Sequence, residues 1–141
     1  MRIIEYRIES PSGRIWGGLA LHYPGFCIPD DLRARFASAA DVPETFFSLS
    51  MDVGARFATD TLGLGPYAAI VAYDRDVLIT HGSEDPLVGL AYSQRAAKAF
   101  AHTELHVIEG AGHGFADGPE LEKATGYLVR FLTSHLATGR R

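Results

Sequence analysis

The chain has 141 residues, which is the usual size of one domain. Its apolar fraction of 47% and charged fraction of 21% are ordinary for a globular protein and argue against disorder. A net charge of −4, without a basic cluster outside the Arg140–Arg141 tail, excludes a nucleic-acid partner. No apolar run approaches the roughly 20 residues that span a bilayer, and the first ten residues do not form a secretory signal. From the length we expect one domain, residues 1–141. A single cysteine excludes an internal disulfide, so we expect the protein in the reducing cytoplasm.

Residues 1–24 have the pattern of a β-hairpin. Apolar side chains alternate with polar ones at Ile4, Tyr6 and Ile8. A turn signal, Pro11-Ser12-Gly13, follows, and a second apolar run extends from Ile15 to Leu21. Two such runs separated by Pro, Ser and Gly predict two antiparallel strands.

Residues 25–73 have the sequence pattern of short helices that are separated by helix-breaking residues. Pro29 and Asp30 can open a helix that reaches about Ala40, since acidic residues suit a helix N-terminus. Pro43 can open a second helix that ends before Gly63. The stretch is rich in Phe and Tyr, which either fill a core or form a mobile lid over an apolar ligand pocket.

The order of elements after residue 73 is strand, helix, strand, helix. Val77–Thr80 is a short β-branched run, Tyr92–Phe100 is rich in helix formers, and Glu104–Ile108 alternates as a strand. A final helix is predicted to start after Asp117, which forms a capping box with Glu120. This order predicts a parallel βαβ unit with helices packed on the sheet, and therefore an α/β fold.

Asp85 and His113 are the candidate catalytic residues. Asp85 follows the first strand of the βαβ unit, and His113 follows the second within a loop that contains Gly110, Gly112 and Gly114. Because parallel strands bring their following loops to the same sheet edge, the carboxylate and the imidazole are expected side by side. A carboxylate that accepts a hydrogen bond from one ring nitrogen leaves the other free to act as a general base. The plain alternative is that Asp85 caps a turn before a proline and that the glycines form a tight turn.

Other residues give no sign of a metal or cofactor site. No H-x-x-x-H or C-x-x-C spacing occurs in the chain, so we expect neither a metal nor a cofactor. His106 alternates with two strand residues and is expected to face solvent or a helix. His81 ends the first strand of the βαβ unit and has no role that its position alone predicts.

Two segments carry a resemblance to the α/β-hydrolase superfamily. Residues 77–88 read VLITHGSEDPLV and resemble the family's acid-bearing strand and loop, while residues 105–115 read LHVIEGAGHGF and resemble its histidine strand and loop. Residues 25–73 resemble the cap of the cinnamoyl-esterase and serine-aminopeptidase-like branch, and residues 1–24 resemble the family's opening hairpin. The resemblance implies a partial α/β-hydrolase fold with an N-terminal hairpin, a helical cap-like insert and a C-terminal βαβα unit.

The resemblance also implies a reaction, which is hydrolysis of a carboxylic ester or related acyl bond, with Asp85 orienting His113 as the base. The family's nucleophile stands in a G-x-S-x-G elbow. None of the eight serines in this chain has that surrounding. Two hypotheses therefore stay open. The chain is a hydrolase that takes its nucleophile from a partner chain or an unrecognised site, or it is a catalytically inactive remnant or binding module.

Cys27 is the one substitute nucleophile with part of the elbow pattern. Gly25 stands two residues before it, and a cysteine elbow is known in the dienelactone-hydrolase-like branch. Pro29, however, occupies the place where the elbow needs a small residue, and proline removes a backbone donor. We therefore interpret Cys27 as an unreactive, half-buried thiol.

Relative to the family, the segment that supplies the oxyanion loop and the central strands is missing near Pro24 and Gly25. A sheet without its centre would expose strand edges, which favours aggregation. We expect compensation either by rearranged strand pairing or by self-association into a homo-oligomer. Beyond that homo-oligomer, the only partner we expect is a small ester or acyl substrate, with no membrane partner.

Overall fold

A mixed four-stranded sheet forms the centre of the molecule. The computed structural model describes residues 2–9, 15–48, 50–115 and 118–138. The sheet order is β1-β2-β5-β6, with bounds β1 Arg2–Glu9, β2 Ile15–His22, β5 Asp76–Gly82 and β6 His102–Ile108. The β1–β2 pair is antiparallel, whereas β2–β5 and β5–β6 are parallel. The predicted hairpin and βαβ unit are both confirmed, while the predicted turn at residues 11–13 and the capping residue Asp117 lie outside the described residues.

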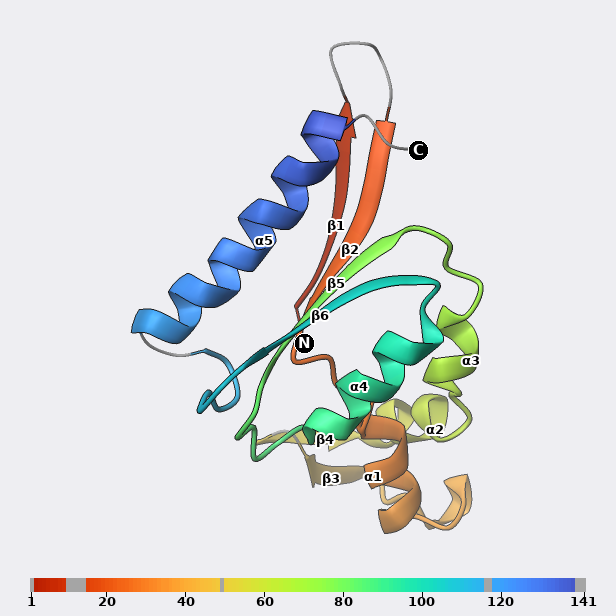
Figure 1. The fold of residues 1–141 in the computed structure, drawn as a ribbon. Coiled ribbons are helices and arrows are strands. Elements are labelled where there is room, and N and C mark those ends of the chain that lie inside the picture. Colours follow the sequence, from red (N-terminus) through yellow and green to blue (C-terminus); the bar gives the residue numbers. More distant parts are fainter. Residues whose placement is uncertain (1, 10–14, 49, 116–117, 139–141) are drawn as a thin grey trace.

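Helices cover both faces of the parallel part of the sheet (Figure 1). The chain places α4, Leu90–Ala99, on one face and α5, Gly118–Thr138, on the other. Side chains alternate along β5 accordingly: Val77 and Ile79 belong to the cluster on the α4 face, and Leu78 packs against Phe131 of α5. This two-sided burial explains why β5 reads as a continuous apolar run. No helix among the described residues is long and apolar enough to cross a membrane.

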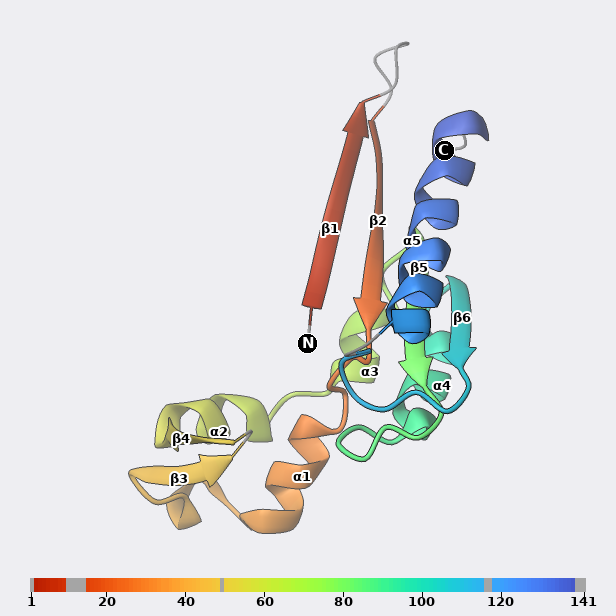
Figure 2. The ribbon, with the colours of Figure 1, turned by 90° about the vertical axis from the view of Figure 1, so that its left-hand side faces the viewer.

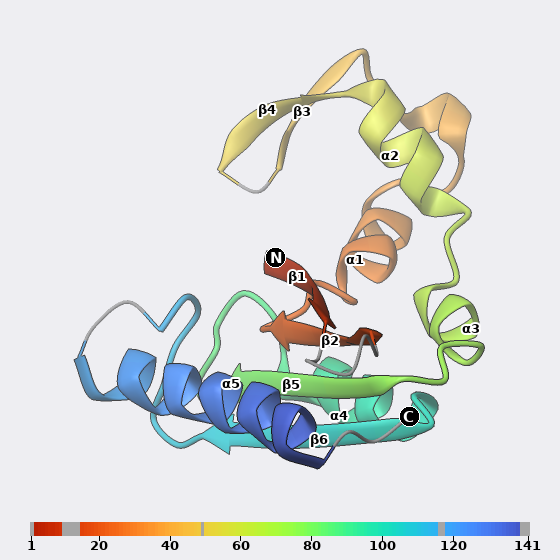
Figure 3. The same cartoon turned by 90° about the horizontal axis from the view of Figure 1, so that it is seen from above.

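Most of residues 25–73 form a separate layer beyond the carboxyl ends of β2 and β5 (Figure 2), while residues 66–70 lie beside α4 and pack against the main sheet. We call residues 25–73 the cap. Its elements are α1 Ile28–Arg35, the 3-10 turn Ala39–Asp41, β3 Thr45–Ser48, β4 Met51–Gly54, α2 Ala55–Leu62 and α3 Pro66–Ile70. The cap has its own buried cluster, made by Leu32, Phe36, Phe46 and Ala58. Seen from above, β3, β4 and α2 lie well away from the main sheet (Figure 3).

The helix predicted to open at Pro43 is wrong. Residues 45–54 form an antiparallel hairpin, β3–β4, and α2 begins only at Ala55 after Gly54. The reason is that Phe46 is buried while Phe47 is exposed, which is a period of two and not of 3.6. Ser50, at the hairpin turn, has a positive φ of 64°, which a helix does not allow. The insert is therefore a mixed layer and not a purely helical one.

The aromatic residues of the insert mostly serve as core. Phe36 and Phe46 pack edge to face with ring centroids 5.2 Å apart inside the cap cluster. Phe26 stacks on Tyr67 at 5.3 Å, and both pack against the α4 side of the main sheet. Phe47 is the exception, since 64% of it is exposed. The core interpretation holds for most of these side chains.

Rearranged strand pairing joins the hairpin to the βαβ unit in one sheet. Leu19 to His22 of β2 pair directly with Val77 to Thr80 of β5, so the sheet has no gap between the hairpin and the βαβ unit. This is one of the two compensations that the sequence predicts. Because β2 is parallel to β5 and β6, the loops that follow all three strands emerge at the same edge.

Candidate active site

Asp85 and His113 meet at the carboxyl edge of the sheet, as the topology predicts. The Nδ1 of His113 and the Oδ2 of Asp85 are 2.8 Å apart, which is a hydrogen bond of ordinary length. The Asp85 side chain is fully buried, whereas the His113 side chain is 28% exposed. The pair therefore combines a shielded carboxylate with an imidazole that solvent can reach.

The hydrogen bonds around Asp85 keep its carboxylate ionised. Its Oδ1 accepts from the backbone amides of Leu87 at 2.8 Å and Val88 at 2.9 Å. Burial raises the pKa of the Asp85 carboxyl, but the hydrogen bonds from Val88, His113 and Leu87 outweigh that effect, so the pKa lies below its ordinary value. The turn-capping alternative is thus also realised, because the same carboxylate caps the turn and faces His113.

The pairing fixes the tautomer of His113. An ionised carboxylate can only accept, so the Nδ1 of His113 carries the proton and the Nε2 has a free lone pair. Within the described parts of the chain, no hydroxyl or thiol forms a hydrogen bond with Nε2. An imidazole in this arrangement can accept a proton at Nε2, and a donor for that proton is not among the described side chains.

Backbone contacts hold the acid loop and the histidine loop together. The amide of Ser83 donates to the carbonyl of Ile108 at 3.0 Å, and the amide of Glu84 donates to the carbonyl of Ala111 at 3.0 Å. The amide of Gly110, whose φ is positive at 74°, donates to the Ser83 hydroxyl at 2.8 Å. The close approach of the two loops requires glycine at position 82, because backbone atoms of the histidine loop lie where a side chain would be.

Gly82 lies where the two loops are closest. A Cβ added there would be 2.1 Å from the carbonyl oxygen of Ala111 and 2.8 Å from that of Gly112. Both are backbone atoms, so a side chain would have to displace the loop that carries His113. The glycine in the His81-Gly82 pair therefore belongs to the site, although the sequence gives it only as the end of a strand.

His81 supports Asp85 from inside the core. The His81 side chain is fully buried, and its Nε2 lies 2.8 Å from the carbonyl oxygen of Val88 and 3.5 Å from the Oδ2 of Asp85. Since a carbonyl only accepts, Nε2 carries the proton, and Nδ1 accepts from the hydroxyl of Ser93 at 2.6 Å. Sequence reasoning missed this arrangement because the orientation of His81 depends on its hydrogen bond with Ser93, which lies twelve residues away on α4.

Tyr23 is a second residue that sequence reasoning missed. It follows β2, and its ring lies against the imidazole of His113 with centroids 4.5 Å apart. The missing information was the parallel pairing of β2 with β5, which brings the loop after β2 to the edge that carries Asp85 and His113. The only sequence signal is the apolar run from Ile15 to Leu21, which ends two residues before this tyrosine.

Cys27 is not poised as a nucleophile. The thiol is buried, and it stands immediately before the first turn of α1. Burial and the nearby Asp31 carboxylate raise the pKa of the thiol to about 12, so the reactive thiolate is scarce at neutral pH. The structure agrees with the interpretation of Cys27 as an unreactive thiol.

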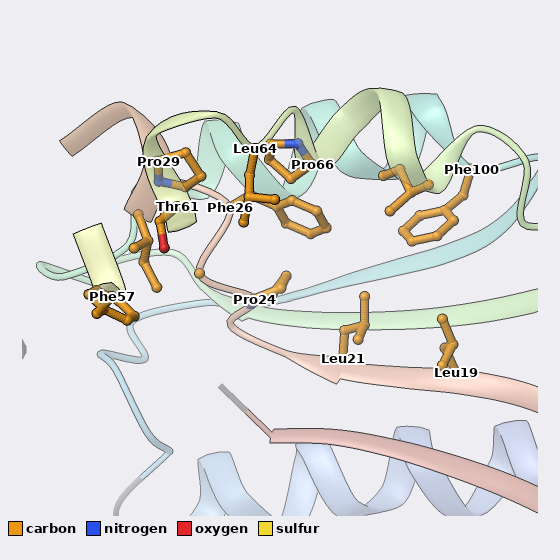
Figure 4. Close-up of a pocket in the computed structure, with 13 residues that line it drawn as sticks. Leu19, Leu21, Pro24, Phe26, Pro29, Phe57, Thr61, Leu64, Pro66 and Phe100 are labelled. Atoms are coloured by element: carbon orange, nitrogen blue, oxygen red, sulfur yellow. The ribbon is translucent and has the colours of Figure 1, made fainter. Parts of the chain in front are cut away.

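An apolar cavity of about 340 Å³ lies between β2 and the cap, next to the loop that carries Tyr23. Figure 4 shows Leu19 and Leu21 entering it from β2, opposite Leu64 and Pro66. Thr61 supplies the only side-chain oxygen among the lining residues. Asp85 and His113 do not line the cavity; Pro24 and Gly25 connect its wall to the loop at Tyr23. Among the residues that the structure describes, no three His, Cys, Asp or Glu side chains group as metal ligands.

Comparison with solved structures identifies the fold. No model of a protein family and no curated protein matches the chain. Est1E from Butyrivibrio proteoclasticus superposes on 86% of this chain with a TM-score of 0.75 and 18% sequence identity. The chain carries part of the α/β-hydrolase fold. At this level of identity the likeness shows the fold alone.

The α/β-hydrolase fold of this chain is incomplete with respect to its structural neighbours. It covers 51% of Est1E, 35% of a monoacylglycerol lipase from Paleococcus ferrophilus and 45% of the bromoperoxidase BpoC from Mycobacterium tuberculosis. The TM-scores of the latter two are 0.51 and 0.50, at 18% and 20% identity over 60% and 75% of this chain. The chain thus spans about half the length of the first solved structures it matches.

Proposed function

We propose that Asp85 and His113 are the acid–base pair of a site that hydrolyses a carboxylic ester or a related acyl bond. The observation that carries the proposal is the 2.8 Å hydrogen bond between a fully buried carboxylate and a partly exposed imidazole. Est1E, with which the chain shares its fold, is also known in a complex with ferulic acid, a hydroxycinnamic acid. A carboxylic acid is the product that hydrolysis of a carboxylic ester releases, so this complex supports an ester as the substrate class of the chain.

The proposed reaction requires a nucleophile from outside the described side chains. The Nε2 of His113 takes a proton from a water molecule or from a hydroxyl that a partner chain supplies, and the freed oxygen attacks the acyl carbon. The Asp85 carboxylate stabilises the resulting imidazolium. The imidazolium then returns the proton to the leaving alkoxide. On the water route this completes the reaction, since ester and water have become acid and alcohol. On the hydroxyl route the acyl group is left on the partner's oxygen, and a water molecule that Nε2 deprotonates in turn then displaces that oxygen, which releases the acid and restores the hydroxyl. A chain without a partner nucleophile performs the water reaction only, and slowly.

The test is hydrolysis of an activated ester, p-nitrophenyl acetate, by the purified chain and two variants. His113→Ala is expected to reduce the rate to the buffer background, because it removes the base. The control is His102→Ala, an exposed histidine at the start of β6, which should keep the full rate. Retained hydrolysis by His113→Ala would refute the proposed pair. A fluorophosphonate probe should label no serine of the isolated chain, since no described hydroxyl pairs with His113.

A second candidate function is binding of a small apolar ligand without turnover. The cavity of about 340 Å³ favours it, because nearly all of its lining side chains are apolar. The test is the fluorescence of N-phenylnaphthylamine, a neutral apolar dye, upon titration with the chain. Leu64→Asp should weaken binding about tenfold by placing a charge at the cavity wall, at a position that is 53% exposed. Val71→Asp, at a 63% exposed position outside the cavity, is the control.

A further inference from the structure

We propose that Tyr23 is a positioning residue that holds the imidazole ring of His113 in its working orientation. The inference rests on the proposed function for its catalytic consequence, but not for its geometry. Tyr23 and His113 lie 4.5 Å apart between ring centroids with an interplanar angle of 56°. The hydrogen bond to Asp85 fixes one nitrogen of His113, yet a ring held at one atom can still turn about that bond. A second contact is needed to fix the plane of the ring.

Backbone strain at Tyr23 is the first observation behind the proposal. Its φ is +39°, a conformation that is unfavourable for a residue other than glycine. Phe115, which follows His113 by two residues, has a φ of +47°. Such strain persists only where the surroundings determine the conformation, and it gathers at functional sites. Of the three non-glycine residues with a positive φ in the described chain, one therefore contacts His113 through its ring and another lies two residues after it.

Packing shows what enforces the strained conformation. The amide of Tyr23 donates to the carbonyl of Thr80 at 2.8 Å, which extends the β2–β5 pairing by one residue. The Tyr23 ring packs edge to face on Phe115 with centroids 5.2 Å apart, beside the cluster of Ile108 and Ala111. Tyr23 is thus fixed at its backbone by β5 and at its ring by the histidine loop.

The consequence is that two side chains hold His113 and a third supports one of them. Asp85 from the β5–α4 loop binds Nδ1, Phe115 from the same loop as His113 supports Tyr23, and Tyr23 from the β2–α1 loop covers the imidazole. Aromatic pairs of this kind stabilise a structure beyond what their buried area alone contributes. Loss of the Tyr23 ring should therefore free the imidazole to turn and expose its Nδ1 proton to water.

The experiment measures His113 directly by NMR of the ring ¹⁵N–H groups, in the full chain at neutral pH. Tyr23→Phe keeps the ring and should keep the slowly exchanging Nδ1 proton of His113. Tyr23→Gly removes the ring, and relief of the positive φ partly offsets the lost ring packing. In the folded variant the Nδ1 proton should exchange about threefold to tenfold faster. Tyr23→Leu, which keeps bulk without a ring, guards against loss of folding and should behave like Tyr23→Gly.

Unchanged proton exchange in folded Tyr23→Gly and Tyr23→Leu would overturn the proposal. So would faster exchange in Tyr23→Phe, because the hydroxyl and not the ring would then be responsible. With ester hydrolysis as a second readout, Tyr23→Gly should lower kcat with little change in KM. If exchange responds to Tyr23 while hydrolysis ignores His113→Ala, the proposed function fails and the positioning role stands.

Discussion

Gly82 couples the acid loop to the histidine loop through a contact that no other residue type permits. Gly82→Ala should destabilise the protein by about 1–3 kcal/mol, because the new Cβ would clash with the backbone of Ala111 and Gly112. Gly112→Ala is the matched control, since a Cβ there meets no atom within 4 Å. Urea unfolding measures both. Equal stability of the two variants would show that the loops can separate without cost.

The lowered pKa of Asp85 makes a prediction about acid stability. A carboxyl whose folded pKa is lowered contributes stability above its unfolded pKa of about 3.9, and that contribution is lost as the pH falls through the folded pKa. Asp85→Asn should therefore reduce the free energy of unfolding more at pH 7 than at pH 3. Asp52→Asn, at an exposed position in β4, is the control. A difference that grows toward acid pH would contradict the assignment of the hydrogen bonds.

At the scale of single residues, local motifs predicted Asp85 and His113 but not their supporting residues. Each of the two follows a strand of the βαβ unit, so chain order alone places them at one edge. Tyr23 and His81 act through contacts with residues far away in sequence, His113 and Ser93. Such contacts depend on how helices and strands pack, which local patterns do not report.

Among the elements, the β3–β4 hairpin contributes one buried side chain, Phe46, to the cap cluster. Phe46 is 5% exposed within the cap cluster, whereas its neighbour Phe47 is 64% exposed. Phe46→Ala should cost about 3–5 kcal/mol within the cap, and Phe47→Ala should cost little. Because the cap cluster is distinct from the clusters on the main sheet, amide exchange should rise in α1 and α2 but not in β5. Exchange that rises equally in β5 would show that the two layers unfold together.

Element types followed from periodicity where the periodic runs are long. The strand β5 and the helix α5 were predicted correctly, because two-sided burial gives a continuous apolar run and one-sided burial gives a helical stripe. The helix expected from Pro43 failed because the run of Thr45 to Ser48 is only four residues long. Two adjacent phenylalanines give no alternating pattern in so short a run, so the opening signal of the proline decided the prediction.

For the whole molecule, the outer edges of the sheet predict self-association. In the described sheet, β1 and β6 each pair on one side only, and unpaired strand edges are templates for another chain. Sedimentation velocity at two protein concentrations, tenfold apart, should show a sedimentation coefficient that increases with concentration. A compact monomer with a single cooperative melting transition at both concentrations would contradict the prediction.

The sequence by itself determined the βαβ unit, the hairpin and the pair of Asp85 and His113. These features are local, because strand period, glycine placement and the order of elements are all written along a short stretch of chain. Only the tertiary structure decided that β2 pairs in parallel with β5, that a cavity separates β2 from the cap, and that Tyr23 contacts His113. The physical reason is that these depend on which strand edges meet, and a strand's sequence pattern reports its buried faces but not its neighbours.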